Sequence, residues 1–137
     1  MRKILKRIGL GLLIIFVLFI GLFVVPYFAN IVMPWDRADA IEAALEWGGL
    51  DKLPESADVV TVDTDGSMFT REFIIEFNCE KKDLESWIQK SNLDKLTPIK
   101  EENGIRVYQV PGQQGAIGGH VYIDKNKDNV IIDMSWS

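Results

Sequence analysis

Cys79 and His120 are the two side chains in this 137-residue sequence that could combine as a nucleophile and its base. A histidine beside a thiol can take its proton and leave a thiolate, the arrangement that thiol-dependent enzymes use. Each is the only residue of its type in the chain, so any such dyad must use this pair. Nothing in the sequence indicates that the two meet, and a lone cysteine is more often a small buried hydrophobic residue. Thiol chemistry is therefore an alternative hypothesis.

Acidic residues near the C-terminus resemble the start of a calcium-binding loop. Asp124, Asn126 and Asp128 stand at alternate positions, as oxygen ligands do in such loops. Asn129 stands where the loop needs glycine and Ser135 where it needs a bidentate glutamate, so a hairpin turn is the better interpretation. The single histidine excludes zinc sites that need two imidazoles. We predict no metal site, and no phosphate loop, nucleophile elbow or dinucleotide fingerprint indicates a cofactor.

A glycine-rich segment, PGQQGAIGG at residues 111–119, joins two predicted strands. It exceeds the usual hairpin loop of about 2 to 5 residues, and long loops often carry function. Gln113 and Gln114 could recognise a polypeptide through amide hydrogen bonds, so we take them as candidate binding residues. The alternative is a mobile connection without a binding role, which the glycine content favours.

The N-terminal segment determines where any such chemistry would take place. Residues 8–25 are apolar and uncharged, and as a helix they would cover about 27 Å, close to the hydrocarbon thickness of a bilayer. Four cations precede them: Arg2, Lys3, Lys6 and Arg7. Cations before a span keep that end of the chain in the cytoplasm. We predict a basic cytoplasmic stub over residues 1–7 and a transmembrane anchor over residues 8–33.

Two other interpretations of the apolar run are weaker. A cleaved secretory signal has a shorter apolar region, about 7 to 15 residues, and small residues before the cut. Here the bulky Tyr27 stands two positions before Ala29, which is a poor cleavage pattern. A buried core helix would have to hide an apolar surface on all sides within a small protein. We therefore expect an uncleaved anchor, with residues 36–137 forming one domain on the far side of the membrane.

This predicted outer domain is acidic. From residue 36 onward, 11 basic residues stand against 20 acidic ones, a net charge of −9, whereas the whole chain carries −5. Nucleic acid and anionic lipid surfaces need dense positive charge, so neither is expected to bind the domain. The expected partners are the membrane, through residues 8–33, and another extracytoplasmic protein of cationic or neutral character. An acidic surface that only maintains solubility is the alternative.

Hydrophobic periodicity predicts the elements of the domain. Helices are expected over residues 36–47, with Asp36 as cap and Gly48–Gly49 as the end, and over residues 80–91. In the second helix the apolar side chains fall at helical spacing: Leu84, Trp87 and Ile88. Alternating or valine-rich runs predict strands over residues 58–64, 68–78, 105–110, 120–124 and 130–136. The fold class is therefore α+β, an antiparallel sheet of about five strands with two helices on one side.

The second predicted strand has the clearest two-residue period. Four apolar side chains are expected on one face: Phe69, Phe73, Ile75 and Phe77. Ile74 interrupts the opposite, polar face, which predicts that this side is partly covered. Asp65–Gly66, just before this strand, is predicted to form the tight turn of a hairpin.

The outline resembles that of small bacterial single-pass membrane-anchored proteins. The resemblance is carried by the N-terminal anchor, the LPESA stretch at residues 53–57, the aromatic strand and the DLESWI helix, and it covers residues 50–91. It implies an extracytoplasmic address without an activity. No N-x-S/T sequon occurs, so nothing indicates a glycosylated eukaryotic ectodomain. We predict a membrane-tethered, non-enzymatic interaction or accessory module, of an immunity-like kind, with a thiol-dependent enzyme as the alternative.

Overall fold

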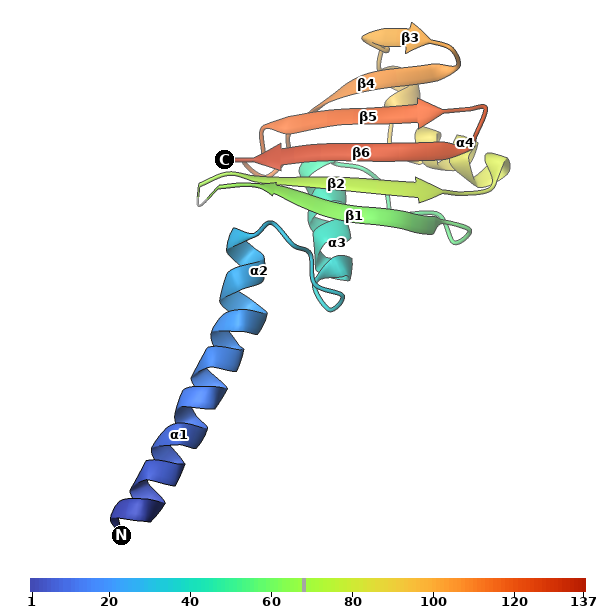
Figure 1. Ribbon diagram of the computed structural model, residues 1–137. Coiled ribbons are helices and arrows are strands. Elements are labelled where there is room, and N and C mark those ends of the chain that lie inside the picture. The colour runs from blue at the N-terminus through green and yellow to red at the C-terminus, as the bar shows by residue number, and fades with distance from the viewer. Residues whose placement is uncertain (68) are drawn as a thin grey trace.

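The N-terminal helix is the first element of the computed structural model, which describes residues 1–67 and 69–137 (Figure 1). It consists of α1, Arg2–Phe19, a π-helical segment, Ile20–Val24, and α2, Val25–Phe28. The section Ile4–Phe28 is long and apolar enough to cross a membrane, and none of its most hydrophobic window is buried against protein. Its length and composition are those that membrane anchors and N-terminal signal sequences have in common.

Six antiparallel strands form one sheet in the order β1-β2-β6-β5-β4-β3 (Figure 1). The strands are β1, Asp58–Gly66; β2, Arg71–Asn78; β3, Lys100–Glu102; β4, Ile105–Pro111; β5, Gly118–Asp124; and β6, Asn129–Trp136. The α+β class is confirmed, but the sequence analysis expected about five strands. The additional strand is β3, which has three charged residues and lies at the edge of the sheet. With no apolar residue to give it a period, only its pairing with β4 reveals it.

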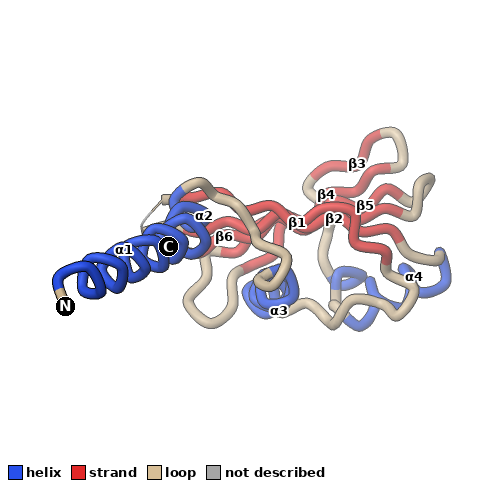
Figure 2. The backbone as a smooth tube through the Cα atoms, turned by 60° about the horizontal axis from the view of Figure 1, so that its bottom comes forward, coloured by secondary structure: helices blue, strands red, loops and turns tan. Residues whose placement is uncertain are grey.

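Two longer helices of the domain cover the same face of this sheet (Figure 2). They are α3, Arg37–Gly48, and α4, Lys81–Lys90, and a short 3-10 helix, Leu93–Lys95, follows α4. The ring of Trp87 in α4 meets Phe77 of β2 edge to face, with ring centroids 5.5 Å apart. The core lies between these helices and the sheet, and its fully buried side chains include Ile75, Phe77, Leu84, Trp87, Leu93, Val121, Ile123, Val130, Ile132 and Met134. The helical spacing of Leu84, Trp87 and Ile88 is thereby confirmed as the apolar side of α4.

One end of α3 agrees with the prediction and the other does not. Gly49 follows the helix with φ +59°, a conformation that glycine adopts without a steric cost, and Leu50 N–H donates to the Leu45 carbonyl (2.8 Å). The predicted glycine stop is therefore confirmed. Asp36 stands at the N-cap position but makes no side-chain capping bond there. Its ψ of −6° is already helical, and an N-cap residue needs an extended backbone to bring its side chain over the free N–H groups.

The connection between β1 and β2 also differs from the predicted tight turn. Asp65 pairs with Glu72 and Gly66 with Arg71, so both predicted turn residues belong to the ladder. The chain reverses over residues 67–70 instead, of which Met68 lies outside the described residues. Phe69 lies in this connection, outside β2, with 78% of its surface exposed, so the prediction that it shares a strand face with Phe73, Ile75 and Phe77 was wrong.

Candidate functional site

The structure does not bring Cys79 and His120 together. Cys79 follows β2 at the end of the sheet where its N–H donates to the Asp128 carbonyl (3.2 Å), and it belongs to the core cluster. His120 pairs with Asp133 of β6. Asp133 comes five residues after Asp128 in the chain, and at the rise of a strand these five residues span roughly 16 Å. Its parity in β5 places it on the face without helices. His120 is therefore too far from Cys79 to act as the base for its thiol.

The environment of Cys79 also disfavours a thiolate. Burial, together with the nearby carboxylates of Asp83 and Asp128, raises the pKa of this thiol from 9.0 to about 11. A reactive cysteine needs the opposite, a low pKa and an electropositive surrounding. Cys79 is therefore built into the fold as a small core residue.

Gln113 and Gln114 lie in the connection between β4 and β5, which is shorter than predicted because Pro111, Gly118 and Gly119 belong to strands. The backbone N–H of Gln113 donates to the Trp47 carbonyl near the end of α3 (2.7 Å). A Cβ at Gly112 would collide with the Ala116 carbonyl oxygen, so glycine is required for this close approach. The glycine content thus serves a fixed loop geometry. Both glutamine side chains are exposed, and their binding role stays a prediction.

The predicted hairpin between β5 and β6 is confirmed. The Asp124 carboxylate accepts hydrogen bonds from the backbone N–H groups of Asn126 (2.9 Å) and Lys127 (3.3 Å). This is the local side-chain bonding by which aspartate stabilises turns. Among residues 1–67 and 69–137, no three His, Cys, Asp or Glu side chains are grouped so that they could hold a metal ion.

A further candidate surface is the face of the sheet opposite α3 and α4. We call it the open face, and the strand register defines its rows. The central rows run from β1 across to β4 as Asp63, Ile74, Asp133, His120 and Gln109, and as Thr61, Glu76, Ile131, Tyr122 and Val107. Acidic, polar and large apolar side chains are therefore mixed on this face. Figure 2 shows no helix over this side.

A cluster of three carboxylates marks one end of the open face. Glu72 of β2 lies between Asp65, its pair in β1, and Asp133, its diagonal neighbour in β6. A hydrogen bond with Asp133, desolvation, and the negative charges of Asp133 and Asp65 together raise the pKa of Glu72 from 4.5 to about 7. Protonated Glu72 can donate this hydrogen bond, so the cluster gains a negative charge as the pH rises through neutrality.

Toward the other end, the open face is hollowed. A depression of about 620 Å³ is lined by apolar side chains, among them Ile105, Tyr122 and Ile131. Its charged lining consists of two carboxylates, Glu76 and Asp124, and one cation, Lys127. Asn129 Nδ2 donates to Glu76 Oε1 (2.9 Å) and holds this carboxylate at the rim. The depression can therefore receive an apolar side chain beside a positive charge.

The open face was not predicted as a site, although Ile74 indicated that this side of the strand is partly covered. That residue was expected to be partly covered, and it is half-buried among its neighbours. The sequence of β6 has the same feature, because Ile131 interrupts the polar side of that strand as Ile74 does in β2. Two such interruptions on strands of one sheet indicate a mixed face.

Comparisons with known proteins identify no relative. No family model matches the chain, and neither a curated protein nor a solved structure matches it.

Proposed function

We propose that this chain is a membrane-tethered, non-enzymatic interaction module that holds a cationic polypeptide segment against its open face. In this proposal the N-terminal helix stays uncleaved in the cytoplasmic membrane of a bacterium, with residues 1–7 inside and the domain outside. The cations before the apolar span support this orientation. The domain would act beside the bilayer as an accessory or immunity-like factor that sequesters or positions its partner.

The composition of the open face is the observation that carries the proposal. The carboxylates of its central rows form no ion pair among the described residues, where the ion pairs join Lys100 with Glu102 and Arg106 with Glu101, at the β3 edge. One cation, Lys127, lines the hollow together with Glu76 and Asp124. Apolar side chains between these carboxylates include Val60, 47% exposed, and Ile105, 39% exposed. Apolar area of this kind, beside unpaired negative charge, is complementary to a segment in which lysine or arginine alternates with apolar residues.

The thiol-dependent alternative has no geometric support. Cys79 lies in the core with a raised pKa, and His120 lies on the open face.

Site-specific photo-crosslinking in cells tests the proposal. A photoreactive amino acid is placed at position 122 on the open face, and at position 85 on the exposed side of α4 as a control. At near-native expression we expect a discrete crosslinked partner from position 122 and none from position 85. Failure to capture any partner from position 122, or the same partner from both positions, would count against the open face.

A peptide of alternating lysine and valine tests the chemistry directly. It is titrated against the detergent-solubilised full chain at low salt. Asp63→Asn combined with Glu76→Gln should weaken binding by about fivefold to tenfold, from two lost charge contacts of roughly 0.5 kcal/mol or slightly more each. The control pair, Asp94→Asn with Glu85→Gln, changes the net charge equally but lies away from the open face. Equal weakening in both variants would indicate nonspecific attraction to an acidic protein.

A further inference from the structure

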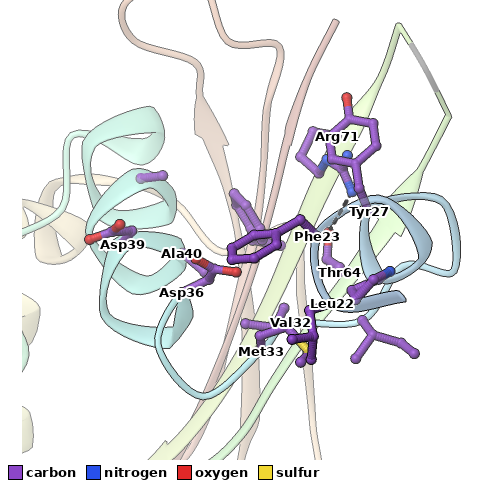
Figure 3. A pocket seen from close by; sticks show the side chains of 14 residues that line it. Leu22, Phe23, Tyr27, Val32, Met33, Asp36, Asp39, Ala40, Thr64 and Arg71 are labelled. Atoms are coloured by element: carbon purple, nitrogen blue, oxygen red, sulfur yellow. Dashed lines mark hydrogen bonds between the residues drawn. The ribbon is translucent and has the colours of Figure 1, made fainter. Parts of the chain in front are cut away.

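A cavity lies where the N-terminal helix meets the domain (Figure 3). Its volume is about 380 Å³, within the range of small-molecule sites. The helix, the connection after it and the covered side of the sheet each supply part of its wall, with Phe23, Val32 and Phe73 as examples. Most of the lining is apolar, so the charged groups in it need a separate explanation.

Arg71 is the cationic group of this cavity. Its guanidinium carbon lies 4.4 Å from the centre of the Tyr27 ring, and its Nη1 donates to Thr64 Oγ1 (3.4 Å). The guanidinium has five N–H donors, and this is the only hydrogen bond it makes among the described residues. Arg71 also makes no ion pair within the part of the chain that the structure describes. Donors and charge are therefore left for a ligand.

Asp36 and Asp39 are the anionic groups of the same cavity. In Figure 3 they lie beyond Phe23 from Arg71, at the start of α3. Asp36 makes no capping bond to its helix, and neither carboxylate forms an ion pair among the described residues. The cavity thus presents a positive group and a pair of negative groups that are separated by apolar surface.

The level of the cavity along the helix indicates its surroundings. The connection between α2 and α3 turns back, so that the rings of Trp35 and Phe23 lie 6.4 Å apart. Phe23 lies five residues before the end of α2 at Phe28, which is about 7.5 Å of helix rise. If the helix spans a bilayer, this level falls at the outer interface, where tryptophan is enriched and lipid head groups lie.

We propose that this cavity binds one zwitterionic phospholipid, with its phosphate at Arg71 and its ammonium group at Asp36 and Asp39. The inference rests on the proposed membrane anchorage, because lipid surrounds the cavity only then. Arginine binds phosphate oxygens through paired, charge-assisted hydrogen bonds, and carboxylates attract an ammonium group. The apolar wall at Leu22 and Phe23 continues into the lipid-exposed helix and receives the acyl chains. An anionic lipid without an ammonium group would face both carboxylates, so it binds less well.

Lipid retention tests this site on the full-length chain. The protein is reconstituted in vesicles of equal parts phosphatidylethanolamine and phosphatidylglycerol, extracted in mild detergent, and its retained lipid is identified by native mass spectrometry. We expect phosphatidylethanolamine to be retained in preference to phosphatidylglycerol. Arg71→Gln should lower that retention by about fivefold, and Arg71→Lys should restore part of it.

The acidic side of the site has a test of its own. Asp36→Asn combined with Asp39→Asn should keep lipid retention but abolish the preference for phosphatidylethanolamine. The matched controls are Arg106→Gln and Asp94→Asn, which lie outside the cavity and should retain lipid as the unaltered chain does. Circular dichroism establishes that each variant is folded.

Two results would overturn the site: equal retention of both lipids by the unaltered chain, or unchanged retention in Arg71→Gln. The intact mass separates this failure from failure of the proposed anchorage. A mature chain that begins beyond Ala29 would contradict the anchorage itself. A full-length chain without lipid preference would contradict only the head-group site.

Discussion

The covered face and the open face of the sheet are built from the same strands, and neighbouring residues show how differently the two are used. Ile75 points into the core and is fully buried, whereas Ile74 points to the open face and is half-buried beside Asp133 and Asp63. The same contrast separates Ile132 from Ile131 in β6. Packing against α3 and α4 explains the fully buried apolar residues of the covered face. The apolar residues of the open face have no helix to pack against, so we infer that they serve contact with another molecule.

Alanine substitutions of the two adjacent isoleucines give the largest expected contrast. Ile75→Ala should lower the free energy of unfolding by about 2–5 kcal/mol, because it removes buried methyl groups and leaves a cavity. Ile74→Ala should cost no more than about 1 kcal/mol, because its side chain keeps partial contact with water. Urea unfolding of the detergent-solubilised chain, followed by tryptophan fluorescence, measures both. Equal losses would mean that the open face is packed as tightly as the core.

Cys79 provides an intermediate effect on the covered side. Cys79→Ser should cost about 1–2 kcal/mol of unfolding free energy, because it places a hydroxyl in an apolar site. In the native chain the thiol should alkylate slowly at pH 8, since a pKa of about 11 rather than 9.0 leaves roughly a hundredfold less thiolate. Labelling followed by mass spectrometry, with a urea-unfolded sample as control, measures the rate. Fast labelling of the folded chain would revive the thiol enzyme.

Glu72 on the open face should give the smallest effect, and its direction depends on pH. The folded chain holds the Glu72 proton more tightly than the unfolded chain does, so this group stabilises the fold fully below pH 4.5 and the contribution is lost as the pH rises through about 7. Glu72→Gln removes the titration and should therefore raise stability at pH 8 relative to the unaltered chain. Because the side chain is largely solvated, we expect a gain below about 1 kcal/mol.

Urea unfolding at pH 5 and pH 8 measures the effect of Glu72→Gln. The matched control is Glu85→Gln on the exposed side of α4, which removes one carboxylate away from Asp65 and Asp133. The control should keep the decline in stability between the two pH values that the unaltered chain shows. If Glu72→Gln kept that same decline, the carboxylate cluster would not be responsible for it.

Elements with a local pattern could be predicted from the sequence, and elements defined by long-range pairing could not. The α4 helix was predicted because Leu84, Trp87 and Ile88 follow the helical period, and the end of α3 because glycine favours positive φ. The β3 strand carries only Lys and Glu, so no hydrophobic period announces it. Asp65–Gly66 is a strong turn dipeptide, yet pairing with β2 extends the ladder through both residues.

The candidate site was less predictable for the same reason. Glu72 and Asp133 belong to strands that are far apart in sequence, because β3, β4 and β5 come between β2 and β6 in the chain. Their contact, and hence the raised pKa of Glu72, follows from that topology. Arg71 meets Tyr27 through the contact between helix and sheet, which no local pattern encodes. The separation of Cys79 from His120 likewise depends on strand order.

If the N-terminal helix is a membrane anchor as proposed, the connection between α2 and α3 limits how far the domain can move from the bilayer. Asn30 Nδ2 donates to Asp65 Oδ1 (3.1 Å) and to the Gly66 carbonyl (3.3 Å), so this short segment is fastened to the hairpin it precedes. A domain held so close to its anchor would stay within a thin layer above the lipid. It would meet a partner by lateral diffusion in two dimensions. Confinement of this kind raises the effective concentration of a partner in the same layer without any new contact, so a low affinity would be enough for binding.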